Sequence, residues 1–173
     1  MVMVYMGGHI SGGHYNPAVT LAVLIRGKMD FKTTSIYWLA QLLGGVLAVV
    51  LTGMLVQDDA FTFKVAPAES ASVVQALLVE IIFTFALALV VLNTATSKRT
   101  EGNSYYGLAI GFTMMMGLFA GGNISGGAFN PAIGICPNLV NLNFPHIWLY
   151  ILGPFIGGAL AGFVFKIQHP GEA

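Results

Sequence analysis

Two copies of one short polar motif are the residues in this chain whose types and spacing could do chemistry. Asn16-Pro17-Ala18 and Asn130-Pro131-Ala132 each open an apolar segment of only ten or eleven residues. Asparagine is a good helix N-cap and proline suits the first helical position, so each motif predicts the start of a helix. Such a helix directs the positive end of its dipole, beside an amide that can donate hydrogen bonds, at whatever precedes it. This chemistry favours a passing neutral polar molecule and repels cations.

The composition places these motifs in a membrane. Only 8% of the 173 residues are charged, against about 25% in a soluble domain, and the mean hydropathy is +0.79. These values exclude a soluble enzyme. The zero net charge gives no reason to expect a nucleic-acid partner, and a single cysteine excludes a disulfide framework or a cysteine metal cluster. We expect no metal and no cofactor.

Four segments are long and apolar enough to cross a bilayer, which takes about 20 residues. The predicted spans are 33–56, 70–97, 104–120 and 144–167, the third of which should end at Gly121-Gly122. The apolar segments 16–25 and 130–140 are half that length. The expected fold class is therefore an all-α membrane protein with four transmembrane helices plus two re-entrant half-helices. Small residues indicate close helix contacts within it, at Gly44, Gly45, Gly157, Gly158 and Ala161.

The basic residues predict the orientation of these spans. With the half-helices returning to their own sides, only Lys64 falls on one face, beside Asp58 and Asp59. Basic residues concentrate on the cytosolic side of membrane proteins, so we assign the other face to the cytosol. That face carries Arg26, Lys28, Lys32, Lys98, Arg99 and Lys166.

Each motif is part of a longer internal repeat. The eleven residues 9–19 match residues 123–133 at an offset of 114, with seven identities, and the spans that follow align at an offset of 113. Three predicted spans separate the two copies, so the copies enter the membrane from opposite sides. An inverted repeat of this kind places a functional site near the membrane midplane. The Ser-Gly-Gly-x-aromatic stretch before each motif cannot face lipid and should line a polar cavity.

At these residues the sequence resembles the aquaporin, or major intrinsic protein, family. The resemblance covers essentially the whole chain and is carried by the segments 11–19, 37–44, 80–85, 109–111 and 125–132. It implies an aquaporin-like inverted repeat, homotetramers with a single-file pore in each protomer, and passive conduction of water or small neutral solutes without enzymatic activity.

The resemblance also implies roles for individual residues. Asn16 and Asn130 would be the central hydrogen-bond donors of the pore. Glu80 would be a buried carboxylate that supports a re-entrant loop, although a charge inside a span can also mark a functional site. His14 would brace its loop, with a pH-sensing role as the alternative. The expected pore-lining carbonyls belong to Gly13, His14, Tyr15, Gly126, Ala128 and Phe129.

Three residues stand at the positions of the family's narrow outer filter: Leu118, Gly127 and Ile133. Water-selective members carry an arginine at the place of Ile133 and commonly a histidine at the place of Leu118. Aliphatic side chains there leave a less polar rim. The pattern looks most like plant tonoplast intrinsic proteins, which suggests a vacuolar-type membrane. We expect passage of water and also of ammonia, urea, glycerol or hydrogen peroxide.

We expect residues 1–173 to form one membrane domain, with 1–56 an incomplete first repeat and 68–168 the second. Compared with the family pattern, the first span and most of the second are absent from the chain. Two functions stay open. One is a channel that a longer chain or a neighbour completes. The other is a non-conducting, aquaporin-derived structural subunit of a larger membrane complex. In either case the expected partners are the lipid bilayer and other membrane subunits or copies of the chain.

Overall fold

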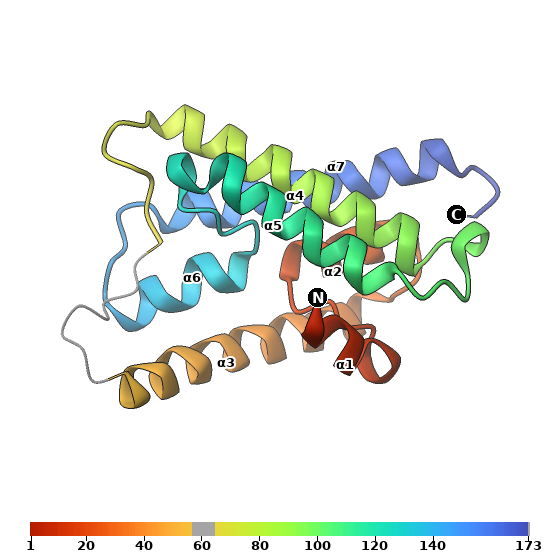
Figure 1. Cartoon of the computed structure of the whole chain (residues 1–173), viewed down its shortest axis with the longest axis horizontal. Helices are drawn as coiled ribbons and strands as arrows, with labels where there is room; N and C mark the ends of the chain where they lie inside the picture. Colours follow the sequence, from red (N-terminus) through yellow and green to blue (C-terminus); the bar gives the residue numbers. More distant parts are fainter. Residues whose placement is uncertain (57–64, 173) are drawn as a thin grey trace.

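The computed structural model describes residues 1–56 and 65–172, and in these residues all regular structure is helical (Figure 1). Four helices are long and apolar enough to cross a membrane, and two further apolar helices are short. This confirms the predicted fold class. The long helices are α3 (Phe31–Leu55), α4 (Val73–Ala95), α5 (Tyr106–Ser125) and α7 (Ile147–Gln168). The shorter ones are α1 (Val2–Ser11), α2 (Pro17–Arg26), the 3-10 helix η1 (Lys98–Thr100) and α6 (Pro131–Val140).

Local capping sets where two of the long helices begin. Asp30 precedes α3, and its side chain accepts a hydrogen bond from the Thr33 N–H at 2.7 Å. Ser72 precedes α4 and exchanges side-chain and backbone hydrogen bonds with Gln75, which satisfies two N–H groups at once. Each cap directly precedes its helix, so the observed starts at Phe31 and Val73 lie two and three residues from the predicted starts at 33 and 70.

The predicted end of the third span is wrong. Helix α5 does not stop at Gly121-Gly122 but continues to Ser125, where Gly126 adopts a left-handed φ of 89° and its N–H bonds to the Gly122 carbonyl. Gly121 serves close packing instead, because a Cβ atom there would lie 2.6 Å from Val79. Helix α1 is also absent from the predicted elements. The charged residues Asp58, Asp59 and Lys64, used for orientation, lie outside the described residues.

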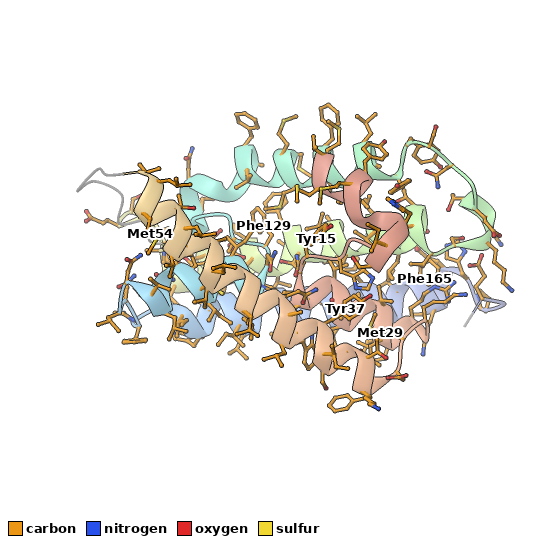
Figure 2. All side chains as sticks on the ribbon, turned by 90° about the horizontal axis from the view of Figure 1, so that it is seen from below. Tyr15, Met29, Tyr37, Met54, Phe129 and Phe165 are labelled. Atoms are coloured by element: carbon orange, nitrogen blue, oxygen red, sulfur yellow. The ribbon has the colours of Figure 1, made fainter. Side chains whose placement is uncertain are left out.

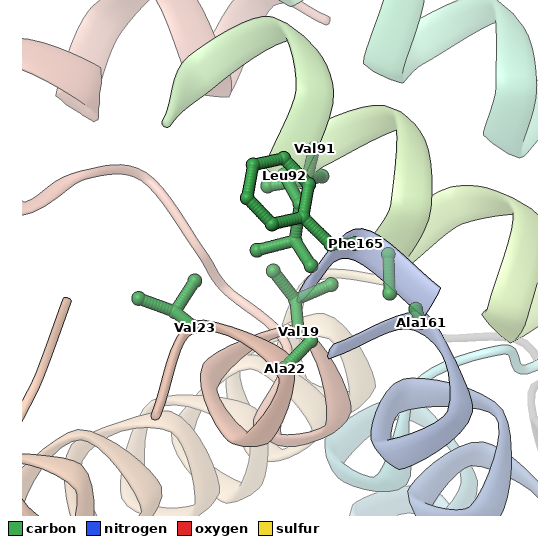
Figure 3. Close-up of a cluster of buried hydrophobic side chains, with 8 residues drawn as sticks. Val19, Ala22, Val23, Val91, Leu92, Ala161 and Phe165 are labelled. Carbon is green, nitrogen blue, oxygen red and sulfur yellow. The ribbon is translucent and has the colours of Figure 1, made fainter. Parts of the chain in front are cut away.

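The main apolar core joins α2 to two long helices of the second repeat (Figure 3). Phe165 of α7 is fully buried and lies against residues of α4 and α2. The buried members are Val19, Ala22, Val23, Ala88, Val91, Leu92, Ala161 and Phe165. The first half-helix is thus held by the second repeat, which brings the two motifs together although they are far apart in sequence.

Glycines let each half-helix approach a long helix of the opposite repeat. A Cβ at Gly158 of α7 would lie 2.4 Å from the Ala18 carbonyl oxygen of α2. A Cβ at Gly45 of α3 would lie 2.6 Å from Cys136 Sγ of α6. Among the described residues no atom lies within 4 Å of such a Cβ at Gly44, so the predicted close contact is not found there. Gly44 instead lines the space between α3 and α6.

The two repeats are covered unequally. None of the most apolar stretch of α3 is buried, whereas 44% of the corresponding stretch of α7 is. Helix α4 packs along α7, and no described helix takes the matching place beside α3. In Figure 2, α3 runs along one face of the molecule, with Met54 near one end. One face of the first repeat therefore presents apolar side chains outward.

Candidate functional site

The two short helices meet with their N-terminal ends at the centre of the molecule. Asn16 caps α2 by accepting hydrogen bonds from the N–H groups of Ala18 and Val19 at 2.9 and 3.4 Å. Asn130 caps α6 in the same way, accepting from the Ala132 N–H at 2.9 Å. The two asparagines have nearly equal backbone angles, with φ −150° and −161°. The positive ends of both helix dipoles therefore converge on one place.

The two motifs are also joined by a reciprocal pair of hydrogen bonds. Asn16 Nδ2 donates to the Phe129 carbonyl at 2.8 Å, and Asn130 Nδ2 donates to the Tyr15 carbonyl at 2.8 Å. Figure 2 shows Tyr15 and Phe129 close together near the centre of the molecule. A primary amide has two N–H donors. The second N–H of each asparagine has no partner in the part of the chain that the structure describes, so it is available to a passing molecule.

Tyr15 and Phe129 have an unusual backbone conformation. Both have φ 47°, in the left-handed region that bulky residues rarely adopt. Such a conformation costs about 1–3 kcal/mol and persists only where the surroundings enforce it. The glycines just before them, Gly13 and Gly127, also have positive φ. Both loops therefore turn sharply enough to present a carbonyl to the asparagine of the opposite repeat.

Only some of the six expected carbonyl residues are brought to the centre. Tyr15 and Phe129 are held there by their hydrogen bonds with the asparagines, and Gly13 and His14 line a cavity that also reaches Tyr15. Gly126 and Ala128 do not line that cavity. A Cβ at Gly126 would lie 2.8 Å from the Ala66 carbonyl, so this residue packs against the segment before α4.

Glu80 of α4 holds the second loop, residues 125–129, in place through hydrogen bonds. The side chain is fully buried. Its carboxylate accepts hydrogen bonds from the Ser125 hydroxyl at 2.8 Å, the Ala128 N–H at 3.0 Å and the Phe129 N–H at 2.7 Å. Because the Phe129 carbonyl in turn accepts from Asn16, this buried carboxylate positions one of the two partners at the centre.

The first loop is held by neutral polar side chains. The Thr20 hydroxyl donates to the Asn16 carbonyl at 3.0 Å and lies 2.9 Å from Gln41 Nε2 and 3.2 Å from His14 Nδ1. A hydroxyl has only one proton, and here it is used on Asn16. His14 must then donate to Thr20, which assigns its ring proton to Nδ1. The ring also lies 5.3 Å from that of Tyr37.

Two tyrosines that contact the motif loops were not among the site residues predicted from the sequence. Tyr37 donates to the Ser11 carbonyl at 2.8 Å, and Tyr150 donates to the Ser125 carbonyl at 2.5 Å. Each bond satisfies the carbonyl of the last residue of the helix before a motif. The signal that could have found them is the repeat itself, since they are equivalent at the offset of 113 residues.

Two cavities meet at the asparagines. The first, of about 720 Å³, extends from the loop that follows α4 to Asn16 and Asn130. The second, of about 760 Å³, runs between α3 and α6 toward the opposite end of the molecule. They share four lining residues: His14, Tyr15, Asn130 and Ile133. The two cavities therefore adjoin beside Asn130 and extend from there toward opposite ends of the molecule, and Asn16 lines the first of them.

The three expected filter residues are placed in two groups. A Cβ at Gly127 would lie 2.8 Å from Leu118 Cδ2, so these two residues are neighbours. Ile133 lines both cavities on the first turn of α6 and is 38% exposed. None of the three side chains can donate or accept a hydrogen bond. In residues 1–56 and 65–172, no group of three His, Cys, Asp or Glu side chains could hold a metal ion.

Comparison with known proteins finds one family throughout. Residues 1–165 match the family described as Major intrinsic protein. The chain is 40% identical to the putative aquaporin NIP4-1 of Arabidopsis thaliana, over 96% of this chain and 58% of that protein. It is also 40% identical to the probable aquaporin TIP3-2 of rice, Oryza sativa subsp. japonica, over 94% of this chain and 61% of that protein. The chain spans about three fifths of the length of these curated relatives.

A solved structure has the same fold. The X-ray structure of the aquaglyceroporin from Plasmodium falciparum superposes with a TM-score of 0.83 over 98% of this chain and 78% of that one. The sequence identity is 21%, so this similarity bears on the fold.

Proposed function

The chain belongs to the major intrinsic protein family, and from this premise we propose that it forms the core of a passive membrane channel for water and small neutral solutes. The observation that carries the proposal is the reciprocal hydrogen bonding of Asn16 and Asn130 at two opposed helix ends, where two cavities meet. A structural scaffold needs no unpaired amide donor at the junction of two cavities. A channel for neutral molecules needs such a donor to replace the hydrogen bonds that the passing molecule loses.

The proposed mechanism needs no chemical step. A water molecule that leaves one cavity accepts a hydrogen bond from the free N–H of each asparagine in turn. These bonds replace a hydrogen bond to the next water molecule in the single-file column. A cation meets the positive ends of α2 and α6, each equivalent to about half an elementary charge, and is repelled. The carboxylate of Glu80 binds the second loop and lines neither cavity, so a cation at the asparagines has no direct contact with it.

The proposed range of solutes follows from the three expected filter residues. Leu118, Gly127 and Ile133 offer an apolar, partly side-chain-free rim. Such a rim imposes no fixed charge on a solute. We propose that ammonia, urea, glycerol and hydrogen peroxide pass in addition to water.

The proposed conducting unit contains apolar helices beyond those described. The cavity between α3 and α6 reaches loop residues such as Tyr15, and α3 presents an uncovered apolar face. Loop backbone cannot face lipid without losing its hydrogen bonds. We propose that apolar segments of a longer chain or of a neighbouring subunit cover this side. The same open face is what favours the alternative, a non-conducting structural subunit.

Assembly and location follow the family as proposals. We propose a homotetramer, or an assembly with other membrane subunits, in a vacuolar-type membrane. Native mass spectrometry of the protein in mild detergent would give the number and identity of the chains.

The test is stopped-flow light scattering of proteoliposomes that contain the purified protein and any chain that co-purifies with it. We expect water, urea and glycerol permeabilities above those of protein-free liposomes. Ile133→Arg should lower urea and glycerol permeability about tenfold, equal to about 1.4 kcal/mol of added barrier, while water still passes. Folded protein with only background permeability to water would refute the channel and support the structural subunit.

A further inference from the structure

The end of the chain returns to the open end of the first cavity. Figure 1 shows the segment after α7 turning back beside the loop that follows α4. A hydrogen bond from the Glu172 N–H to the His169 carbonyl at 3.0 Å closes this turn. The His169 ring packs 4.5 Å from the ring of Phe165, and its Nε2 lies 2.9 Å from Asn93 Oδ1. The tail, residues 169–172, is thus packed against α4 and α7.

A buried arginine receives the tail. Arg26, the last residue of α2, is only 1% exposed, and its guanidinium lies 4.7 Å from the centre of the Phe165 ring. It donates to the Glu172 carbonyl oxygen at 2.5 Å and to the Glu172 carboxylate at 3.1 Å. It also donates to the Thr96 side chain at 2.9 Å and to the Thr96 carbonyl at 3.0 Å. A buried guanidinium requires such partners, and Glu172 supplies its charge partner.

The Glu172 carboxylate also binds the loop after α4. It accepts hydrogen bonds from the Ser97 hydroxyl and from the Lys98 N–H, both at 3.0 Å. The Lys98 N–H bond, with further contributions from Ser97, His169 and Arg26, holds the pKa of this carboxyl below its ordinary value. One carboxylate therefore connects the end of α2, the start of η1 and the tail.

The loop held in this way forms the wall of the first cavity. Its lining includes the residues that Glu172 contacts, Ser97 and Lys98, and continues through Gly102 and Asn103. The basic residues near it place this end of the molecule on the cytosolic side. Residues of the segment 96–103 therefore border the cytosolic mouth of this cavity.

We propose that the tail is a clasp: Glu172 fixes residues 96–103 to Arg26 in the position that keeps the cytosolic mouth open. Without the clasp the loop samples positions over the mouth, and permeability falls. The effect on permeability rests on the proposed channel function, whereas the effect on the loop does not.

The first measurement follows the loop alone. Lys98 and Arg99 have exposed side chains, so trypsin can cut after them whenever the loop opens. Cleavage of a transiently opened segment follows its open population. In mild detergent we expect Glu172→Ala to raise the cleavage rate at Lys98 and Arg99 about tenfold and Glu172→Gln to give an intermediate rate. The matched control is Glu69→Ala, an exposed glutamate at the other end of α4, which should cut like the unaltered protein.

The second measurement is water permeability of proteoliposomes at equal protein content. We expect Glu172→Ala, and a deletion of residues 169–173, to lower it relative to Glu69→Ala, with helix content by circular dichroism unchanged. Equal cleavage rates in Glu172→Ala and Glu69→Ala would overturn the clasp, as would faster cleavage with unchanged or raised permeability. Background permeability in the unaltered protein would instead refute the channel, and the cleavage rates would still decide whether Glu172 holds the loop.

Discussion

Replacing Gly158 by alanine tests whether the close approach of α2 to α7 positions the centre of the channel. The glycine lies on α7, and the added methyl group would stand 2.4 Å from the Ala18 carbonyl oxygen. Ordinary contact begins at 3.4 Å, so the two helices would have to separate by about 1 Å. Ala18 follows Asn16 by two residues, and any shift of the half-helix is transmitted to the amide that bonds the Phe129 carbonyl at 2.8 Å.

The magnitude follows from three opposing contributions. Alanine favours a helix over glycine by about 1 kcal/mol. Overpacking of a tight contact costs about 1–3 kcal/mol, and loss of the Asn16 hydrogen bond costs about 0.5–1.5 kcal/mol. Together these predict a net destabilisation of about 0.5–3.5 kcal/mol for Gly158→Ala. The control is Gly53→Ala in α3, where no described atom lies within 4 Å of the added Cβ. Gly53 lines neither cavity, so only the helix preference changes. That variant should be stabilised by up to about 1 kcal/mol.

The assay is unfolding of both variants by sodium dodecyl sulfate in mixed micelles, followed by circular dichroism. Water permeability of proteoliposomes at equal protein content gives the functional readout. We expect the two variants to differ in stability by about 1.5–4.5 kcal/mol, since the helix preference is common to both, and only Gly158→Ala to lose permeability. The reasoning is refuted if Gly158→Ala matches the unaltered protein in both measurements, or if Gly53→Ala is as damaging as Gly158→Ala.

Two further predictions concern carboxylates. Glu80→Ala leaves two buried N–H groups and a hydroxyl without their acceptor. It should therefore lower the free energy of unfolding by about 3–5 kcal/mol. The control Glu69→Ala should change the free energy of unfolding by less than about 0.5 kcal/mol. The same micelle assay measures both, and equal effects would contradict the bracing role of Glu80. The pKa of Glu172 in the folded protein lies below its ordinary value, chiefly because of the hydrogen bond from the Lys98 N–H. The stabilisation that the ionised carboxylate gives to the loop is therefore complete above the ordinary pKa, and it is lost as the pH falls through the lowered pKa. Amide-exchange protection of residues 96–103 should therefore be constant from about pH 8 to about pH 5 and fall only in stronger acid; a loss of protection near neutral pH would contradict this.

Much of the fold could be predicted because the relevant patterns are local. A run of some 20 apolar residues is long enough to cross a bilayer wherever it lies in the chain. Asparagine followed by proline starts a helix through its own backbone and side chain. The failures have a common cause. Gly121 and Gly44 are chemically identical in the sequence, and only the neighbours that they meet decide that one allows close packing inside a helix while the other has no neighbour within contact.

The sequence by itself determined the membrane class, the helix starts to within a few residues, and the inverted repeat, because apolar length, capping and internal similarity can be found from the order of the residues alone. Only the tertiary structure decided which groups meet. In the structure, each motif's amide donates to a carbonyl more than 110 residues away, and Glu80 accepts from the Phe129 N–H. Arg26, which the sequence analysis used only to assign orientation, is buried and forms an ion pair with Glu172. Such pairings depend on how the helices pack around small residues, and packing over long separations leaves no local pattern to read.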